Sequence, residues 1–125
     1  MVGIAAYGAY VPRHRLGAGT SGWNTEMERS AANFDEDSVT MAVAAGLDCL
    51  RGRDRQAVDG LVFATTTPPY AEKQCAAIIA EALDLRRDIF SADVTDVLRA
   101  GTTGLKAGLD SVAAGSAKQV LVIAS

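Results

Sequence analysis

The sequence contains few of the residues from which metal centres and covalent cross-links are built. Among its 125 residues are one histidine, His14, and two cysteines, Cys49 and Cys75. These three side chains are too few to predict a Cys/His metal cluster, so no metal centre is expected. Both cysteines fall inside helical patterns of apolar residues, where a reduced and buried thiol is expected in preference to a disulfide or a ligand.

A strong excess of positive charge and a long apolar run are missing as well. Twelve Lys and Arg residues against fifteen Asp and Glu residues give a formal net charge of -3, which argues against a nucleic-acid partner. No apolar run reaches the roughly 20 residues that cross a bilayer, and the first residues lack the basic start of a secretory signal. A cytoplasmic protein without a membrane segment is therefore expected.

Apolar residues are abundant, at 49% of the chain, and they follow two alternating patterns. Short apolar runs typical of strands alternate with segments in which apolar residues recur at helical spacing. This order predicts one α/β domain over residues 1–125, with a mostly parallel sheet covered by helices on both faces. Strands are predicted at residues 2–11, 61–64, 89–94 and 119–125, helices at residues 39–50, 75–84 and 100–114, and a loop at residues 17–33.

Some polar residues could have a chemical role but have simpler interpretations. Asp93 and Asp96 flank the turn after the third predicted strand, where capping is favoured over an acid/base pair. The basic run of Arg13, His14 and Arg15 predicts a solvated turn, with contact to an anionic group as the alternative. The three tyrosines are interpreted as core or interface aromatics: Tyr7, Tyr10 and Tyr70.

The carboxyl ends of the predicted strands are where ligands collect in an open α/β sheet. The loops after residues 64 and 94 are therefore the segments in which to expect a site. The chain stops on its most apolar predicted strand, with nothing after it to cover that edge. More protein, in the same polypeptide or in a partner, is expected to lie there.

Four segments, taken in order, resemble the amino-terminal half of the thiolase superfamily: GIAAYGAYVPR at residues 3–13, FDEDSVTMA at 34–42, FATTTPPY at 63–70 and RAGTTGL at 99–105. They are most similar to hydroxymethylglutaryl-CoA synthase-like proteins, and the Thr-rich segment also to 3-ketoacyl-acyl-carrier-protein synthase III. The resemblance implies a fold of two similar α/β halves, of which the carboxy-terminal one is absent here. It further implies a dimer, as a homo- or hetero-oligomer, and acyl-thioester chemistry through an acyl-cysteine.

The resemblance places the family's nucleophilic cysteine at Leu98, where the third strand turns into a central helix. That location lowers a thiol pKa, and the thiolate is the attacking species. A leucine cannot attack, and Cys49 and Cys75 lie in other predicted helices. The family's general acid/base glutamate aligns with Thr66, whose hydroxyl is no proton acceptor near neutral pH. The synthase III branch lacks this glutamate too.

An acyl-CoA-associated protein without Cys-dependent condensation is the leading hypothesis, with acyl-CoA as substrate or ligand and no further cofactor. Related proteins without the cysteine cleave carbon-carbon bonds of CoA thioesters beside a zinc-ribbon and OB-fold partner. A component of such a lyase is therefore one form of the leading hypothesis. The alternatives are a non-catalytic structural subunit, suggested by the small residues at 100–108, and an active condensing enzyme that uses Cys75. The resemblance implies four candidate substrate-binding residues: Thr66, Thr67, Tyr70 and Arg99.

Overall fold

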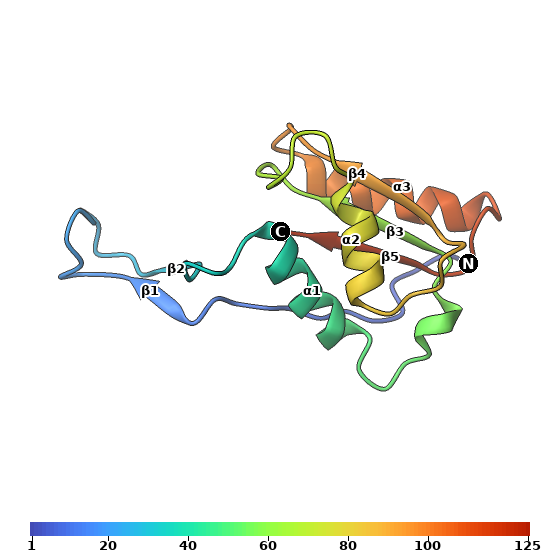
Figure 1. Ribbon diagram of the computed structural model, residues 1–125, viewed down its shortest axis with the longest axis horizontal. Helices are drawn as coiled ribbons and strands as arrows, with labels where there is room; N and C mark the ends of the chain where they lie inside the picture. Colours follow the sequence, from blue (N-terminus) through green and yellow to red (C-terminus); the bar gives the residue numbers. More distant parts are fainter.

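A computed structural model describes residues 1–125 as a small α/β body from which an amino-terminal arm projects (Figure 1). The arm holds a short hairpin, and the body contains three strands, three α-helices and one turn of 3-10 helix. The elements in chain order are β1 (His14–Leu16), β2 (Arg29–Ala31), α1 (Ser38–Cys49), the 3-10 turn (Arg55–Ala57), β3 (Gly60–Ala64), α2 (Cys75–Ala82), β4 (Phe90–Val94), α3 (Ala100–Ala113) and β5 (Val120–Ala124).

The sheet of the body is parallel, with β3 between β4 and β5. All five residues of β3 are buried, as expected for a central strand with helices on both faces. At its carboxyl end Ala64 lies opposite Val94 and Ala124. At its other end Gly60 has no room for a side chain, because a Cβ there would lie 2.1 Å from the Phe90 ring. The prediction of a parallel α/β sheet is confirmed.

Helix α3 covers one face of the sheet at very short range. A Cβ at Gly108 would lie 2.6 Å from Cγ2 of Val122, and one at Gly104 would lie 3.3 Å from Cγ1 of Val62. Both glycines are buried. The small residues at 100–108, which suggested contact with a partner subunit, therefore include the two that let α3 approach this chain's own strands.

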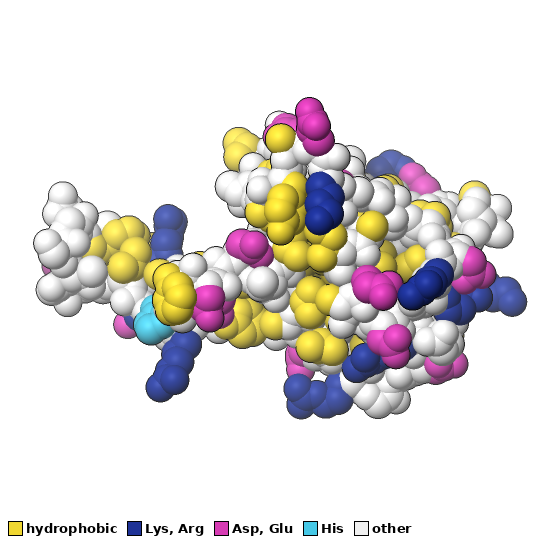
Figure 2. Space-filling model, viewed as in Figure 1, with side chains coloured by type: hydrophobic (Ala, Val, Ile, Leu, Met, Phe, Trp, Pro, Cys, Tyr) yellow, Lys and Arg dark blue, Asp and Glu magenta, His cyan; other side chains and the backbone are white.

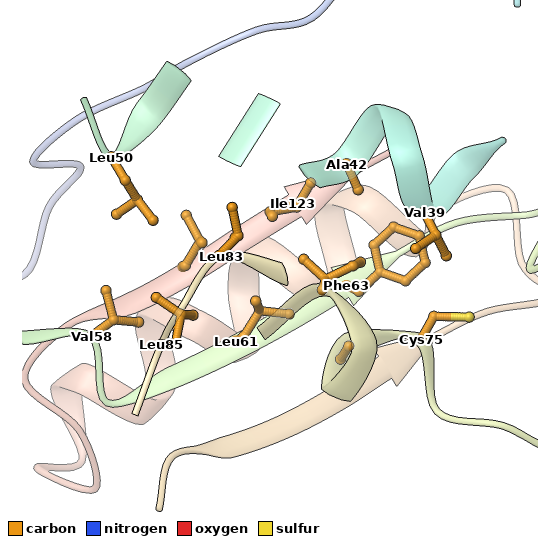
Figure 3. Packing of buried hydrophobic residues seen from close by; sticks show 13 residues of the cluster. Val39, Ala42, Leu50, Val58, Leu61, Phe63, Cys75, Leu83, Leu85 and Ile123 are labelled. Carbon is orange, nitrogen blue, oxygen red and sulfur yellow. The ribbon is translucent and has the colours of Figure 1, made fainter. Parts of the chain in front are cut away.

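Helices α1 and α2 cover the opposite face and enclose the main core (Figure 3). Leu61 and Phe63 of β3 pack there with Ile79 of α2 and with Leu83, and all four are fully buried. Ile123 of β5 joins them with 4% of its surface exposed. Burying such side chains contributes about 1.5–3 kcal/mol each, so this cluster is the principal source of stability in the body.

Local signals in the sequence set two of the helix ends. Asp37 begins α1 in a capping box: its carboxylate accepts from the amide of Thr40 at 2.8 Å, and its own amide donates to Oγ1 of Thr40 at 2.7 Å. At the end of α3, Ala114 is the C-cap and Gly115 follows with φ of +77°. That left-handed conformation suits glycine because it has no Cβ to clash with the backbone.

Residues 2–11 do not form the buried strand that their composition predicts. The segment is extended but belongs to no strand, makes no backbone-backbone hydrogen bond, and is mostly exposed. Ile4 and Tyr7 expose 72% and 91% of their surface. Tyr7 and the 37%-exposed Tyr10 are therefore not core residues of this chain. An apolar run predicts a strand only where a neighbouring strand supplies the ladder, and none lies beside these residues.

The loop predicted at residues 17–33 is wrong at its carboxyl end. There β2 pairs antiparallel with β1, with His14 opposite Ala31 and Leu16 opposite Arg29. Each strand has only three residues, too few for a period of two to be recognised in the sequence. The intervening turn is closed by the indole of Trp23, whose Nε1 donates to the Met27 carbonyl at 2.9 Å.

Candidate active-site edge

Two loops leave the sheet side by side at its carboxyl edge, one after β3 and one after β4 (Figure 1). The amide of Thr65 donates to the carbonyl of Val94 at 3.0 Å, so the two loops begin in contact. On the other side of β3, the amide of Ser125 donates to the carbonyl of Ala64 at 3.0 Å. The sequence-predicted site residues in these two loops therefore belong to the same edge of the sheet.

The loop after β3 has one buried threonine and two exposed ones. Thr65 is buried, and its Oγ1 accepts from the amide of Thr67 at 3.2 Å. The hydroxyl of Ser38, at the start of α1, donates to the carbonyl of Thr67 at 3.0 Å and ties the loop to that helix. These bonds fix the backbone and leave the side chains of Thr66 and Thr67 exposed.

Tyr70 lies farther along the same loop and is 46% exposed, so it is not a core residue. The ammonium group of Lys73 lies 5.2 Å from the centroid of its ring, within range of a cation-π contact. The hydroxyls of Thr66 and Thr67 and the ring of Tyr70 thus form a solvent-facing surface beyond β3. A ligand at this edge could contact all three side chains.

The loop after β4 presents Leu98 at the start of α3, with 95% of its surface exposed. Asp96, with φ of +63°, turns the chain just before it. Arg99 is the N-cap, makes no side-chain cap, and is exposed, and no acidic residue lies in the first turn of α3. The positive end of this helix therefore has no anionic side chain of its own. Leu98 occupies the place where a nucleophile would benefit from that end.

Helix α2 begins at the same edge but is capped by a carboxylate. Asp93 of β4 accepts from the amides of Cys75 and Ala76 at 2.6 and 2.7 Å. The interpretation of Asp93 as a capping residue is confirmed, although it caps α2 and not its own turn. Asp96 accepts from the hydroxyl of Thr95 at 2.8 Å. The two aspartates thus have separate partners and do not form an acid/base pair.

The Cys75 thiol lies in surroundings that keep it protonated. Cys75 is fully buried, and burial raises the pKa of its thiol. The nearby negative charge of Asp93 raises that pKa further. Cys49 is half-buried, and both cysteines are free. Cys75 therefore lacks the exposed, electropositive surroundings of a reactive thiol.

The remaining candidates lie away from this edge. Arg13, His14 and Arg15 are exposed, and Arg15 is 3.4 Å from a Glu28 carboxylate oxygen across the hairpin. The basic run is thus solvated on the projecting arm (Figure 2), with Arg13 in a bend and His14 and Arg15 in β1, where a turn was predicted. The structure contains no group of three or more His, Cys, Asp or Glu side chains placed to hold a metal ion. None of its helices has the length and hydropathy needed to cross a bilayer.

Known proteins resemble this chain in both sequence and structure, although no protein-family model matches it. The hydroxymethylglutaryl-CoA synthase of Thermococcus sibiricus is 37% identical over 130 residues, covering 98% of this chain and 37% of the relative. The structure of β-ketoacyl-acyl-carrier-protein synthase III from Thermus thermophilus has a TM-score of 0.82 at 27% identity, covering 94% of this chain and 40% of its own. The 3-oxoacyl-acyl-carrier-protein synthase III of Aquifex aeolicus has a TM-score of 0.86 at 23% identity. That match covers 100% of this chain and 44% of the Aquifex aeolicus chain.

The fold and these likenesses define the chain as a thiolase-like α/β unit that corresponds to the amino-terminal part of its longer relatives. Its sequence is similar to the hydroxymethylglutaryl-CoA synthases. The predicted family and fold are confirmed. The chain spans less than half the length of the relatives it matches.

Proposed function

We propose that this chain supplies the acyl-CoA-binding edge of a thiolase-like protein that does not carry out Cys-dependent condensation. One observation carries the proposal: Leu98, with 95% of its surface exposed, stands at the uncapped start of α3. A thiol at a helix start is activated by the helix amides, whereas a leucine there cannot attack a thioester. The coarser assignment, a thiolase-like acyltransferase family, is supported by the sequence relatives and the solved structures.

The exposed groups of this edge suit the two ends of an acyl-CoA. The guanidinium of Arg99 can bind a phosphate through paired hydrogen bonds. The hydroxyls of Thr66 and Thr67 can bond the thioester or the pantetheine amides, and Tyr70 offers an apolar ring. Amides at the start of α3 can stabilise negative charge on a thioester oxygen. These four side chains are the proposed acyl-CoA contacts.

A lyase role is compatible with Leu98 because carbon-carbon cleavage needs no acyl-enzyme. In a retro-aldol reaction a base removes the hydroxyl proton of a 3-hydroxyacyl thioester, and the bond between its α and β carbons breaks. The aldehyde or ketone leaves, and the electron pair remains as an enolate that is then protonated to the shorter thioester. Oxyanion stabilisation at the start of α3 would serve that enolate. The base would come from the rest of the assembly, because Thr66 cannot fill that role.

The proposed assembly comprises the remainder of the thiolase-like fold, in the same or a second chain, as a homo- or hetero-oligomer. A zinc-ribbon and OB-fold protein is the proposed partner of the lyase form. The coverage of 37% of the Thermococcus sibiricus relative supports the need for further protein. A location in the cytoplasm is part of the same proposal.

The two alternatives have less support. A purely structural subunit would use small residues against a partner, but Gly104 and Gly108 are buried on this chain's own strands. An active synthase through Cys75 would need a thiolate, yet burial and the charge of Asp93 raise the pKa of that thiol. The structural subunit remains the hypothesis to adopt if no acyl-CoA binds.

Acyl-CoA binding tests the proposal through a matched pair of arginines. Arg99→Ala should weaken acetyl-CoA binding by the assembled protein about tenfold, the loss expected when a charged hydrogen bond disappears. Arg87→Ala is the control, because Arg87 is also exposed but lies before β4, at the opposite edge. Titration calorimetry gives both affinities. Equal effects of the two variants, or no saturable binding, would contradict the proposal.

A further inference from the structure

The second half of the loop after β3 is not held by its own backbone. In the first half, hydrogen bonds from Thr65 and Ser38 fix the chain as far as Thr67. Residues 68–74 make no backbone-backbone hydrogen bond. The position of this stretch therefore depends on side chains, and Gln74, at the end of the loop, supplies two hydrogen bonds.

Gln74 is attached to the edge strand β4 by a reciprocal pair of hydrogen bonds with Ser91. Its Nε2 donates to the carbonyl of Ser91 at 2.8 Å, and the hydroxyl of Ser91 donates to its Oε1 at 2.9 Å. Only one orientation of the amide group satisfies both contacts, because a flipped amide would point its oxygen at the Ser91 carbonyl. The pair thus requires a side chain that both donates and accepts.

The carbonyl that Gln74 binds lies on the outer edge of the sheet. The amide of Phe90 and the carbonyl of Val94 bond to residues that flank β3. Ser91 alternates with them along the strand and therefore faces away from β3. No strand of this chain lies beyond β4. Gln74 thus satisfies a peptide carbonyl that would otherwise need a neighbouring strand or water.

Gln74 is also the N-cap residue of α2, but capping does not occupy its side chain. That side chain makes no cap hydrogen bond. Asp93 caps the helix instead, by accepting from the amides of Cys75 and Ala76. The two attachments to β4 are therefore separate: Asp93 holds the start of the helix, and Gln74 holds the end of the loop.

The part of the loop next to Gln74 contains Lys73 and, three residues earlier, Tyr70. The Lys73 ammonium lies 5.2 Å from the centroid of the Tyr70 ring and links the ring to the end of the loop. The thiol of Cys75 donates to the Lys73 carbonyl at 3.8 Å, but sulfur is a weak donor. Tyr70 and Lys73 are both exposed, so burial does not fix them. The bonds to Ser91 are the stronger attachment close to the ring.

We propose that Gln74 is a positioning residue, which holds the Tyr70 ring at the carboxyl edge of the sheet through its pair of bonds to Ser91. It would act on a ligand only through Tyr70, with Lys73 as the link between them. This role rests on the proposed function for its ligand, an acyl-CoA. A glutamate could not take the role, because it would accept from the Ser91 hydroxyl but could not donate to the carbonyl.

Chymotrypsin cleavage after Tyr70 tests the position of the loop without a ligand. In the full 125-residue chain, Gln74→Ala and Gln74→Glu should each raise the initial rate of cleavage at this bond. The rise should be at least about fivefold, because the loop opens more often once it loses its hydrogen bonds. Ser91→Ala removes only one of the two bonds and should give a smaller rise. Peptide mass spectrometry measures each rate.

A second glutamine gives the matched control. Gln56 is also exposed, and its Nε2 donates to the carbonyl of Asp84 at 3.3 Å, at the opposite edge of the sheet. Gln56→Ala should leave cleavage after Tyr70 unchanged, and cleavage after the fully buried Phe63 should stay slow in every variant. An unchanged rate in both Gln74 variants, an equal rise in Gln56→Ala, or a parallel rise at Phe63 would overturn the proposal.

Acetyl-CoA binding by the assembled protein tests whether the position of the ring affects a ligand. Gln74→Ala should weaken binding about threefold to tenfold when Tyr70 is present, and should have no further effect when Tyr70→Ala is already in place. Equal weakening in both backgrounds would reveal general damage and overturn the positioning role. If the wild type does not bind acetyl-CoA, the proposed function fails, while the cleavage rates still decide whether Gln74 holds Tyr70.

Discussion

Helices α2 and α3 both begin beyond the carboxyl edge of the sheet, yet their first turns differ in charge and in accessibility. Helix α2 begins with Cys75, a buried thiol whose amide donates to the Asp93 carboxylate. Helix α3 follows Leu98, which is exposed, and has neither a side-chain cap nor an acidic residue in its first turn. A helix start favours one nearby anion, and at α2 Asp93 already supplies it. The thiol and the surroundings that would activate a thiol therefore occur at different helices.

The largest effect is expected from placing a thiol at the start of α3. Leu98→Cys should create a thiol that iodoacetamide alkylates at neutral pH at least about tenfold faster than Cys75, because the helix amides lower its pKa and it is exposed. Alkylation rates measured by peptide mass spectrometry give the comparison. Lys106→Cys, in the middle of α3 at a position where 75% of the side chain is exposed, controls for exposure. If that control thiol reacts as fast as the one at position 98, the helix start has no special effect.

At α2, removing the cap should destabilise the body. Asp93→Ala deletes the acceptor for two helix amides and should cost about 1–2 kcal/mol of unfolding free energy. Asp93→Asn should lose less, since its amide oxygen can still accept, and it should also lower the pKa of the Cys75 thiol by removing the neighbouring charge. Urea unfolding measures the first effect and thiolate absorbance against pH the second. An unchanged Cys75 pKa in Asp93→Asn would refute the electrostatic part of the comparison.

Helix α3 is held by close packing against the sheet and has no side-chain cap at its start. Glycine substitutions can test how much stability depends on that packing. Gly108→Ala should cost about 1 kcal/mol or more, because its Cβ would lie 2.6 Å from Cγ2 of Val122 and force repacking. Gly101→Ala should stabilise by up to about 1 kcal/mol, since its Cβ would meet Ala124 at an ordinary 3.5 Å and alanine favours helix. Thermal unfolding of both variants measures these opposite changes in stability. Stabilisation by both would mean that α3 tolerates a wider spacing.

The smallest effect concerns Asp59, at the opposite edge of the sheet. Amides of Lys118 and Gln119 donate to its carboxylate at 2.6 and 3.1 Å, and these bonds, helped by Arg86, lower its pKa. The contribution of Asp59 to stability is therefore complete above its pKa in the unfolded chain, about 3.9. That contribution is lost as the pH falls through the lower pKa of the folded state. Asp59→Asn should reduce the loss of stability in acid. Urea midpoints of both proteins, measured from about pH 5 to about pH 2, should converge toward the acid end. Parallel curves would show that Asp59 does not contribute.

The sequence predicts the body well because its signals are local. The cap at Asp37, the glycine after α3 and the apolar run of β3 each act within a few residues. The strand predicted at residues 61–64 is confirmed. The family resemblance likewise identifies Leu98 at the turn into α3. The strand predicted at residues 2–11 is wrong. Strand formation there depends on a neighbouring strand, and the local sequence pattern does not show whether one is present.

The candidate site is predicted only in part. Sequence assigns Asp93 to capping but cannot identify its partner, since Cys75 lies 18 residues away and only the parallel pairing of β3 with β4 brings the two together. Together with burial, the larger cause, that contact raises the pKa of the Cys75 thiol. The hydrogen bonds from Ala9 to Asp48 and from Arg53 to Ala5 cannot be predicted either, because nothing local to a charged residue identifies a distant backbone partner.

The intact mass of the assembled protein after incubation with acetyl-CoA tests the central claim most directly. Wild-type protein should keep its mass, because Leu98 cannot be acylated and the Cys75 thiol is buried and protonated. Leu98→Cys, treated in parallel, provides the reference for a gain of one acetyl group. A stable acetyl adduct on either cysteine of the wild-type chain would contradict the account and restore an acyl-enzyme mechanism.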